Sequence, residues 1–190
     1  TLEAVILDYI ESFEKIYGRT TNSDDYAIRF KHVIKAAHEK TGQRTVVLVD
    51  EYDKPLLDVM DNKTLYYQND NGEKIAYETH NRDILKGFYG AFKDADEDLK
   101  FVMLTGVTKF SQVSVFSGFN QPDDISLDEK YESLCGITKE ELLTVFDNPI
   151  HSLAANKNKS YEDMVAMLTE KYDGYHFSSK MTGIFNPFSI

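Results

Sequence analysis

Two strand-like segments constrain the fold of this chain more than any other feature. Residues 44–49 read RTVVLV, and the lack of polar alternation is typical of a strand covered on both faces of a parallel sheet. A second strand-like run covers residues 100–105 and is followed by Gly106. Both runs are flanked by segments with helical periodicity, so the sequence predicts an α/β fold.

Helical segments occupy much of the remaining sequence. Apolar residues recur at helical spacing over residues 2–17, and Gly18 supplies a stop after them. A hairpin is expected within residues 62–78, around the sequence NDNG. A second helix is predicted to follow an N-cap at Ser23 or Asp24 and to end at about residue 40. Another is predicted over residues 79–97. Two more should follow the N-caps Thr138, which forms a capping box with Glu141, and Ser160.

Two strands are too few to form a parallel sheet that is covered on both faces, so we expect further strands outside this sequence. The chain starts at Thr1, directly in a helical pattern, and ends in NPFSI without a polar tail. We therefore expect it to be a segment of a longer protein. Within the segment we expect an α/β core over residues 1–135 and a helical region over residues 136–190.

The overall composition narrows the classes of function. The chain has 190 residues, 42% of them hydrophobic, and its apolar runs are too short to span a membrane. The net charge of −11 argues against nonspecific nucleic-acid binding by this chain, because that needs a surplus of lysine and arginine. The single cysteine, Cys135, excludes a disulfide framework and a cysteine-rich zinc site, and favours a cytoplasmic protein.

Acidic residues follow the first strand-like run directly, in the sequence VVLVDEYDKP. Ligands of open α/β sheets bind beyond the carboxyl ends of the strands, so Asp50 and Glu51 are candidate functional residues. One acid can face a hydrated Mg²⁺ while the other faces an attacking water, because side chains alternate along a strand. The residues alone support equally well the alternative that both acids are solvated and have no function.

The second strand-like run continues into MLTGVTKF, residues 103–110. If the two strands are neighbours, Thr105 or Thr108 lies near the same crevice, and Lys109 can meet an anion there. The alternative is an ordinary turn that needs a glycine and uses threonine as filler.

The remaining polar candidates are weaker. His176 stands among aromatic residues after a glycine-terminated helix, where packing on the core explains it better than catalysis. The other histidines lack metal-ligand spacing, and Cys135 has no nearby histidine in the sequence. The phosphate-binding pattern G-x-x-x-x-G-K-[ST] does not occur, so this chain does not cradle a triphosphate in that way by itself.

Several long motifs, in this order, resemble one family. The chain resembles the AAA-ATPase-like domain of many bacterial proteins, which usually precedes a PD-(D/E)XK nuclease-like domain. The motifs that carry the resemblance are VVLVDEYDKPLLD, the segment from NRDILKGFYG to GITKEEL, YDGYHFS and NPFSI. The resemblance covers roughly residues 40–190. It implies a P-loop NTPase-type α/β fold, a helical lid over residues 136–190, ATP and Mg²⁺ as ligands, and a nuclease-like effector domain in the intact protein.

The resemblance also implies roles for individual residues. Asp50 and Glu51 match the Walker B pair, with Asp50 for Mg²⁺ and Glu51 for the attacking water. LTGVTKF matches the strand that carries the sensor residue, for which Thr105 is the first choice and Lys109 the second, with Thr108 as a nucleotide contact.

One expected element of the family is absent. Its GKS-type Walker A loop does not occur in this sequence, and we expect it to precede Thr1 in the longer protein. We therefore expect the intact protein to hydrolyse ATP and this chain alone to be inactive. Self-association stays open, and Arg44 and Arg82 are candidate arginine fingers that nothing in the sequence separates from solvated surface arginines.

Two other functions also stay open. A regulatory or interaction module of the same fold would bind nucleotide as a switch without hydrolysing it. A stand-alone metal-dependent hydrolase would use Asp50, Glu51, Asp53 and Asp58, and would need at least three of these carboxylates to converge.

Overall fold

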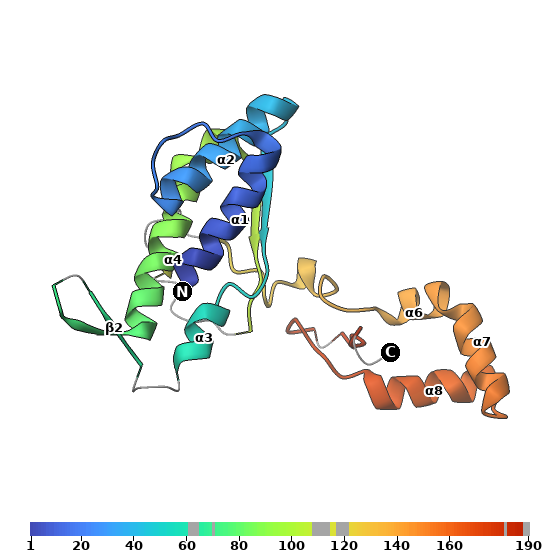
Figure 1. Ribbon diagram of the computed structural model, residues 1–190. Helices are drawn as coiled ribbons and strands as arrows, with labels where there is room; N and C mark the ends of the chain where they lie inside the picture. Colours follow the sequence, from blue (N-terminus) through green and yellow to red (C-terminus); the bar gives the residue numbers. More distant parts are fainter. Residues whose placement is uncertain (61–64, 70, 108–114, 117–121, 181, 188–190) are drawn as a thin grey trace. The chain divides into compact units, whose positions relative to one another are not determined.

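The computed structural model describes residues 1–60, 65–69, 71–107, 115–116, 122–180 and 182–187. The chain divides into two units, Thr1–Pro122 and Asp123–Ile190, and each is described by itself (Figure 1).

A small parallel sheet organises the first unit. Strand β1 (Thr45–Val49) pairs with strand β4 (Leu99–Leu104), in a register that places Val47 opposite Val102. Both valines pack against the main hydrophobic core, on the face of the sheet that the helices cover. The prediction of a mixed α/β fold with parallel strands flanked by helices is therefore confirmed.

The other face of this sheet carries apolar side chains that are exposed. Val46 is 50% exposed, Leu48 70% and Phe101 53%. They alternate along the strands with the core-facing residues and so point the opposite way. The prediction that the first strand is covered on both faces is wrong for this chain, because the described residues leave this second face exposed.

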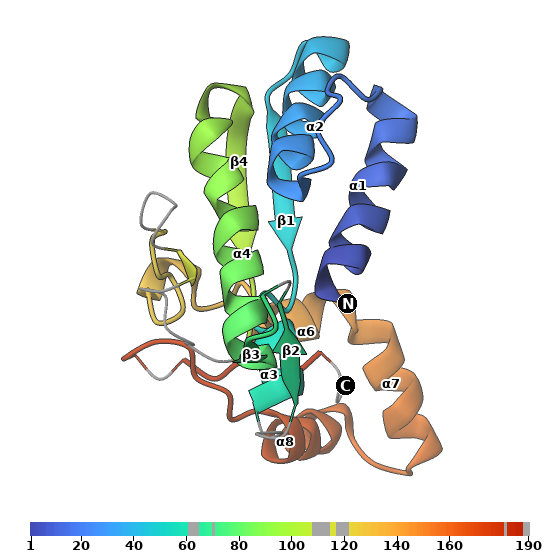
Figure 2. The same ribbon diagram turned by 60° about the vertical axis from the view of Figure 1, so that its left-hand side comes forward.

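Three helices cover the first face of the sheet. Figure 2 shows α2 (Tyr26–Thr41) in front of β1 and α4 (Tyr77–Asp94) in front of β4, with α1 (Leu2–Tyr17) beside α2. Their apolar faces converge on one core, in which Phe30 of α2 stacks on Phe88 of α4 with ring centroids 4.5 Å apart. The fully buried large side chains of this core are Ile10, Ile34, Leu56, Tyr89, Phe92 and Val115.

The start of α2 differs from the sequence prediction. Asp25 is the N-cap, and its side chain accepts a hydrogen bond from the Ile28 amide at 2.9 Å. The predicted caps have other contacts, since Arg19 donates to the carbonyl oxygen of Ser23 at 2.9 Å and to the carboxylate of Asp24 at 3.1 Å. The helix therefore follows Asp25, one residue after the later of the two predicted caps.

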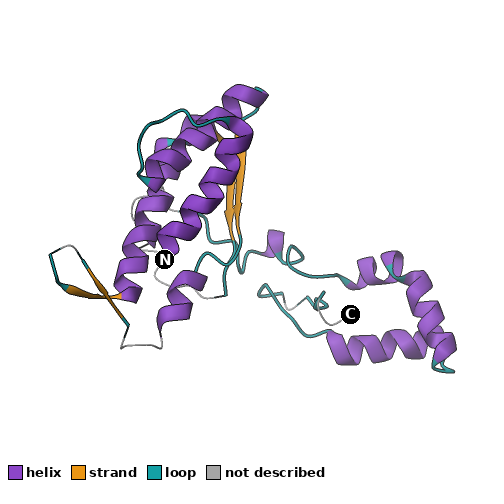
Figure 3. Cartoon of the chain, in the orientation of Figure 1, coloured by secondary structure: helices purple, strands orange, loops and turns teal. Residues whose placement is uncertain are grey.

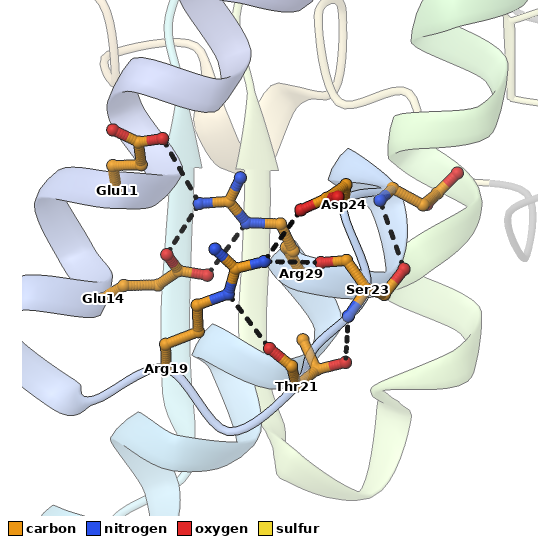
Figure 4. A network of polar contacts seen from close by, with 8 residues as sticks. Glu11, Glu14, Arg19, Thr21, Ser23, Asp24 and Arg29 are labelled. Atoms are coloured by element: carbon orange, nitrogen blue, oxygen red, sulfur yellow. Dashed lines mark hydrogen bonds and ion pairs between the residues drawn. The ribbon is translucent and has the colours of Figure 1, made fainter.

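A largely buried ion pair joins α1 to α2 (Figure 4). Arg29 donates to both carboxylate oxygens of Glu14, from Nε at 3.1 Å and from Nη2 at 2.7 Å. The side chains are 5% and 9% exposed, respectively, while Glu11, at 3.6 Å from Arg29, is 54% exposed. A bidentate pair of this kind sets the position of one helix against the other as well as contributing energy.

The connection from β1 to β4 contains a hairpin and two short helices in addition to α4. The hairpin strands β2 (Tyr66–Gln68) and β3 (Lys74–Ala76) are antiparallel, which confirms the predicted hairpin (Figure 3). The ring of Tyr67 stacks on His80 of α4 with centroids 3.9 Å apart. The short helices are α3 (Lys54–Met60), directly after β1, and the 3₁₀ helix η1 (Asp96–Asp98), directly before β4.

The second unit consists mainly of helices. They are the 3₁₀ helix η2 (Glu129–Tyr131), α6 (Lys139–Val145), α7 (Asp147–Asn156) and α8 (Tyr161–Tyr172). The predicted capping box of α6 and the predicted N-cap Ser160 of α8 are both present. This unit has its own core, which contains Leu142, Ile150, Ala154, Met164 and Phe185.

Candidate functional site

The carboxyl ends of β1 and β4 lie side by side, and backbone hydrogen bonds continue beyond both strands. The Thr105 amide donates to the carbonyl oxygen of Val49 at 2.8 Å. The Tyr52 amide in turn donates to the carbonyl oxygen of Thr105 at 2.8 Å. The two segments that follow the strands are therefore held together by the backbone.

Asp50 and Thr105 face each other at these strand ends. The register that pairs Val49 with Leu104 places Asp50 and Thr105 next to each other one residue later. The Thr105 hydroxyl donates to Oδ1 of Asp50, and the Glu51 amide donates to the same oxygen at 3.0 Å. Two donors on one oxygen orient the carboxylate, and the side chain is still exposed to solvent.

Glu51 has an unusual backbone conformation. Its φ angle is 52°, in the left-handed region that residues with a side chain rarely adopt, and the residue is exposed. A non-glycine residue in this region costs of the order of 1–2 kcal/mol. Such strain is often found at functional sites.

Asp53 is buried behind this pair. It is 1% exposed, and its Oδ2 accepts a hydrogen bond from the Val107 amide at 3.0 Å. Its carbonyl oxygen accepts from Leu56 and Leu57 in the first turn of α3. The first turn of α3 is thus bonded to the backbone of Asp53, and the carboxylate turns toward the segment after β4.

Gly106 allows these two segments to approach each other. A Cβ atom at this position would lie 2.6 Å from a ring carbon of Tyr52 and 2.8 Å from Oδ1 of Asp53, which is closer than real contacts allow. The Tyr52 ring also packs against Phe116, with centroids 5.4 Å apart. The glycine therefore serves close packing here.

The interior beneath the strand ends contains Tyr89, which is only 2% exposed. Burial raises the pKa of the Tyr89 hydroxyl well above its ordinary value, and the neighbouring Tyr52 and Asp53 raise it further. Tyr89 is thus neutral at physiological pH. Electrostatic interactions are stronger in such surroundings than in water.

The structure places the predicted site residues as follows. Asp50, Glu51 and Thr105 lie together at the strand ends, whereas Thr108 and Lys109 lie outside the described residues. The close contacts of Asp53 and Tyr52 with the segment after β4 were not predicted. Gly106 in LTGVT was a signal that the backbone approaches another segment closely, but the sequence did not identify Asp53 or Tyr52 as its neighbours.

No cluster of three or more carboxylates is found among the residues that the structure describes. Within the described ranges, no group of three or more His, Cys, Asp or Glu side chains is arranged to hold a metal ion. Asp58 is exposed on α3 and pairs with Lys54 at 3.2 Å. The hydrolase interpretation required such convergence and receives no support.

The other candidates have ordinary contacts. Arg82 forms an ion pair with Glu78 one turn earlier on α4, and Arg44 is exposed before β1. His176 lies 3.2 Å from the carbonyl oxygen of Thr182, and Cys135 is exposed.

A groove of about 620 Å³ lies elsewhere on the first unit, between α2 and α4. Its lining includes Lys31, Lys86 and Gly90, and contains none of the residues at the strand ends. It is therefore separate from the candidate site. None of the described helices is long and apolar enough to cross a membrane.

Comparison with known proteins agrees with the α/β core. A family model described as predicted AAA-ATPase matches residues 1–116. The chain is also 36% identical over 189 residues to an uncharacterized protein in the vnfD 5' region of Azotobacter chroococcum mcd 1. The alignment covers 100% of this chain and 32% of that protein, so the chain spans about a third of its relative. No solved structure matches. By the family model, which matches more than half of its residues, the chain belongs to the predicted AAA-ATPase family.

Proposed function

We propose that this chain supplies the Mg²⁺- and water-facing half of an ATP hydrolysis site in a larger protein. The observation that carries the proposal is the hydrogen bond between Thr105 and Asp50 at the carboxyl ends of two adjacent parallel strands. Ligands of open α/β sheets bind at such ends. Membership of a predicted AAA-ATPase family favours a nucleotide as that ligand.

Asp50 is the residue that would hold Mg²⁺. This ion binds to one or two carboxylates and keeps several waters, so it does not require a cluster of acids. The carboxylate of Asp50 is exposed, and the two donors on Oδ1 set its orientation. When bound, Mg²⁺ would neutralise charge on the β- and γ-phosphates.

Glu51 would orient the attacking water and accept its proton as ATP is converted to ADP and inorganic phosphate. Its left-handed backbone supports this role, because strain is retained at a site when the surrounding structure demands it. Thr105 would act as the sensor residue that connects the nucleotide to Asp50. Lys109 and Thr108, which follow in sequence, are proposed as phosphate and nucleotide contacts.

The other half of the site would come from residues beyond this chain. A P-loop NTPase fold requires a phosphate-binding loop and further strands beside β1 and β4. The exposed apolar side chains of Val46, Leu48 and Phe101 support the addition of such elements, because large exposed apolar patches mark interaction surfaces. In the intact protein, ATP hydrolysis would control a nuclease-like effector domain.

The test uses the full-length protein that contains this chain. We expect Asp50→Asn and Glu51→Gln each to lower the rate of phosphate release by about a hundredfold or more. The matched control is Asp58→Asn, which removes an exposed acid on α3 and should leave the rate unchanged. Melting temperatures near the wild-type value would show that the folds are intact.

Calorimetric titration with ATP and Mg²⁺ distinguishes hydrolysis from a nucleotide switch. Binding without turnover by the wild-type protein would favour the switch. Unchanged phosphate release in both Asp50→Asn and Glu51→Gln would refute the assignment of this site.

A further inference from the structure

Asp53 has a buried carboxylate that none of the roles above uses. It lies three residues after Asp50 and is 1% exposed. Burial of a carboxylate is costly unless hydrogen bonds compensate for the lost water. Burial of the Asp53 carboxylate therefore costs free energy, and the contacts of this side chain indicate its role.

Both carboxylate oxygens of Asp53 lie against one peptide of the segment after β4. Oδ2 accepts the hydrogen bond of the Val107 amide at 3.0 Å. Oδ1 lies where it would be 2.8 Å from a Cβ atom on Gly106, so the carboxylate rests directly against the glycine. The Tyr52 ring lies against the same glycine. The peptide between Gly106 and Val107 is thus held by side chains that follow β1.

These contacts continue the connection between the two strand ends. The Thr105 amide bonds to Val49, and the Tyr52 amide bonds to the carbonyl oxygen of Thr105. Beyond Thr105 the side chain of Asp53 takes over, through the Val107 amide. Thr105 therefore lies between two connections, one through backbone and one through Asp53.

We propose that Asp53 is a positioning residue for ATP hydrolysis at the strand ends. It holds the peptide after Gly106 so that the hydroxyl of Thr105 stays on Asp50. This inference rests on the proposed function. It assigns Asp53 no contact with ATP, Mg²⁺ or water.

Position 53 permits a conservative test. Asparagine has nearly the shape of aspartate and keeps a carbonyl oxygen that can accept the Val107 hydrogen bond, whereas alanine removes the acceptor. Gly106→Ala disturbs the same contact from the other side, because its Cβ atom would push against Tyr52 and Asp53. Asp58→Asn is the matched control, since it removes an exposed acid on the neighbouring helix α3.

In the full-length protein we expect Asp53→Ala and Gly106→Ala to lower kcat for ATP by about tenfold to a hundredfold, because small misplacements of reacting groups have effects of this size. The KM for ATP should change by less than about threefold, since Asp53 does not contact the nucleotide. Asp53→Asn should retain kcat within about threefold of the wild type. Hydrogen exchange at the Val107 amide should be faster in Asp53→Ala than in the wild type or Asp53→Asn.

The outcomes separate this inference from the proposed function. An unchanged kcat in Asp53→Ala, together with faster exchange at Val107, would overturn the positioning role. If Asp53→Ala does not fold, Gly106→Ala and Asp53→Asn decide, and equal kcat values in those two variants would also overturn it. If the wild-type protein does not hydrolyse ATP, the proposed function fails, and with it the catalytic part of this inference; protection of the Val107 amide still reports on the contact.

Discussion

Replacing Arg29 with methionine tests how the first unit is held together. Methionine fills a similar volume but leaves the carboxylate of Glu14, which is 9% exposed, without its bidentate partner. Breaking a buried pair by removing one partner costs about 3–5 kcal/mol. The second acid, Glu11, is 54% exposed and adds little, so we expect the free energy of unfolding to fall by about 3 kcal/mol at pH 7.

The loss of unfolding free energy in Arg29→Met should depend on pH, because the charge of Glu14 does. The hydrogen bond from Arg29 holds the pKa of Glu14 below its ordinary value, and the charge of Arg29 adds to this effect. A carboxyl with a lowered pKa stabilises the fold above its unfolded pKa of about 4.3, and this stabilisation is lost as the pH falls through the folded pKa. In Arg29→Met, protonation of Glu14 removes the buried charge, so the difference from the wild type should shrink below about pH 5.

Urea unfolding of the purified chain, followed by circular dichroism at pH 7 and pH 4.5, measures both effects. Lys35→Met is the matched control, because Lys35 is 53% exposed and only 3.8 Å from Glu39 in an ordinary surface pair. We expect this control to lie within about 0.5 kcal/mol of the wild type. The double variant Arg29→Met with Glu14→Leu should recover much of the loss. Equal stability of Arg29→Met and Lys35→Met at pH 7 would refute the reasoning.

Three further predictions concern the site and the second unit. Thr105→Val should lower kcat for ATP in the full-length protein by about tenfold or more, because a hydrogen bond to a charged group contributes about 1.5–3 kcal/mol. Thr105→Ser keeps the hydroxyl and should restore kcat, so equal rates in the two variants would contradict this prediction. Glu51→Gly should abolish ATP turnover but raise the free energy of unfolding by up to about 1 kcal/mol, since glycine relieves the left-handed backbone strain. Urea unfolding of Glu51→Gln should show no such gain, because glutamine keeps the strained conformation. Ser160→Ala should lower the melting temperature of the chain, at a cost of about 1 kcal/mol, because the Asp163 amide loses its cap at 3.0 Å; an unchanged melting temperature would show that the cap is dispensable.

Local features of the fold were predictable because they depend on neighbours in the sequence. The helix over residues 2–17, the capping box of Thr138 and Glu141, and the hairpin all follow from apolar spacing or from turn residues. The N-cap of α2 was missed because Ser23, Asp24 and Asp25 are all favourable N-cap residues, and only the structure shows that Asp25 accepts the hydrogen bond of the Ile28 amide. Propensities of single residues do not contain that contact.

The candidate site was predictable in part. Parallel pairing of the two strand-like runs brings Asp50 and Thr105 together, since both follow directly on their strands. The contact of Asp53 with Val107 depends instead on how two turns fold over each other, and the sequence pattern contains no signal for that arrangement. The roles of Glu51, Thr105, Thr108 and Lys109 in ATP hydrolysis stay predictions.

The sequence by itself determined helices α1, α2, α4, α6 and α8, the two apolar strands and the acids that follow the first of them, because all of these depend on short-range periodicity and composition. It did not predict helix α7. Only the tertiary structure decided which polar groups are buried. It pairs Arg29 with Glu14 between two helices and turns Asp53 inward against Gly106, although each residue looks like a surface charge in the sequence. Burial of a charge depends on partners that are distant along the chain, and these come together only when the helices and strand ends pack.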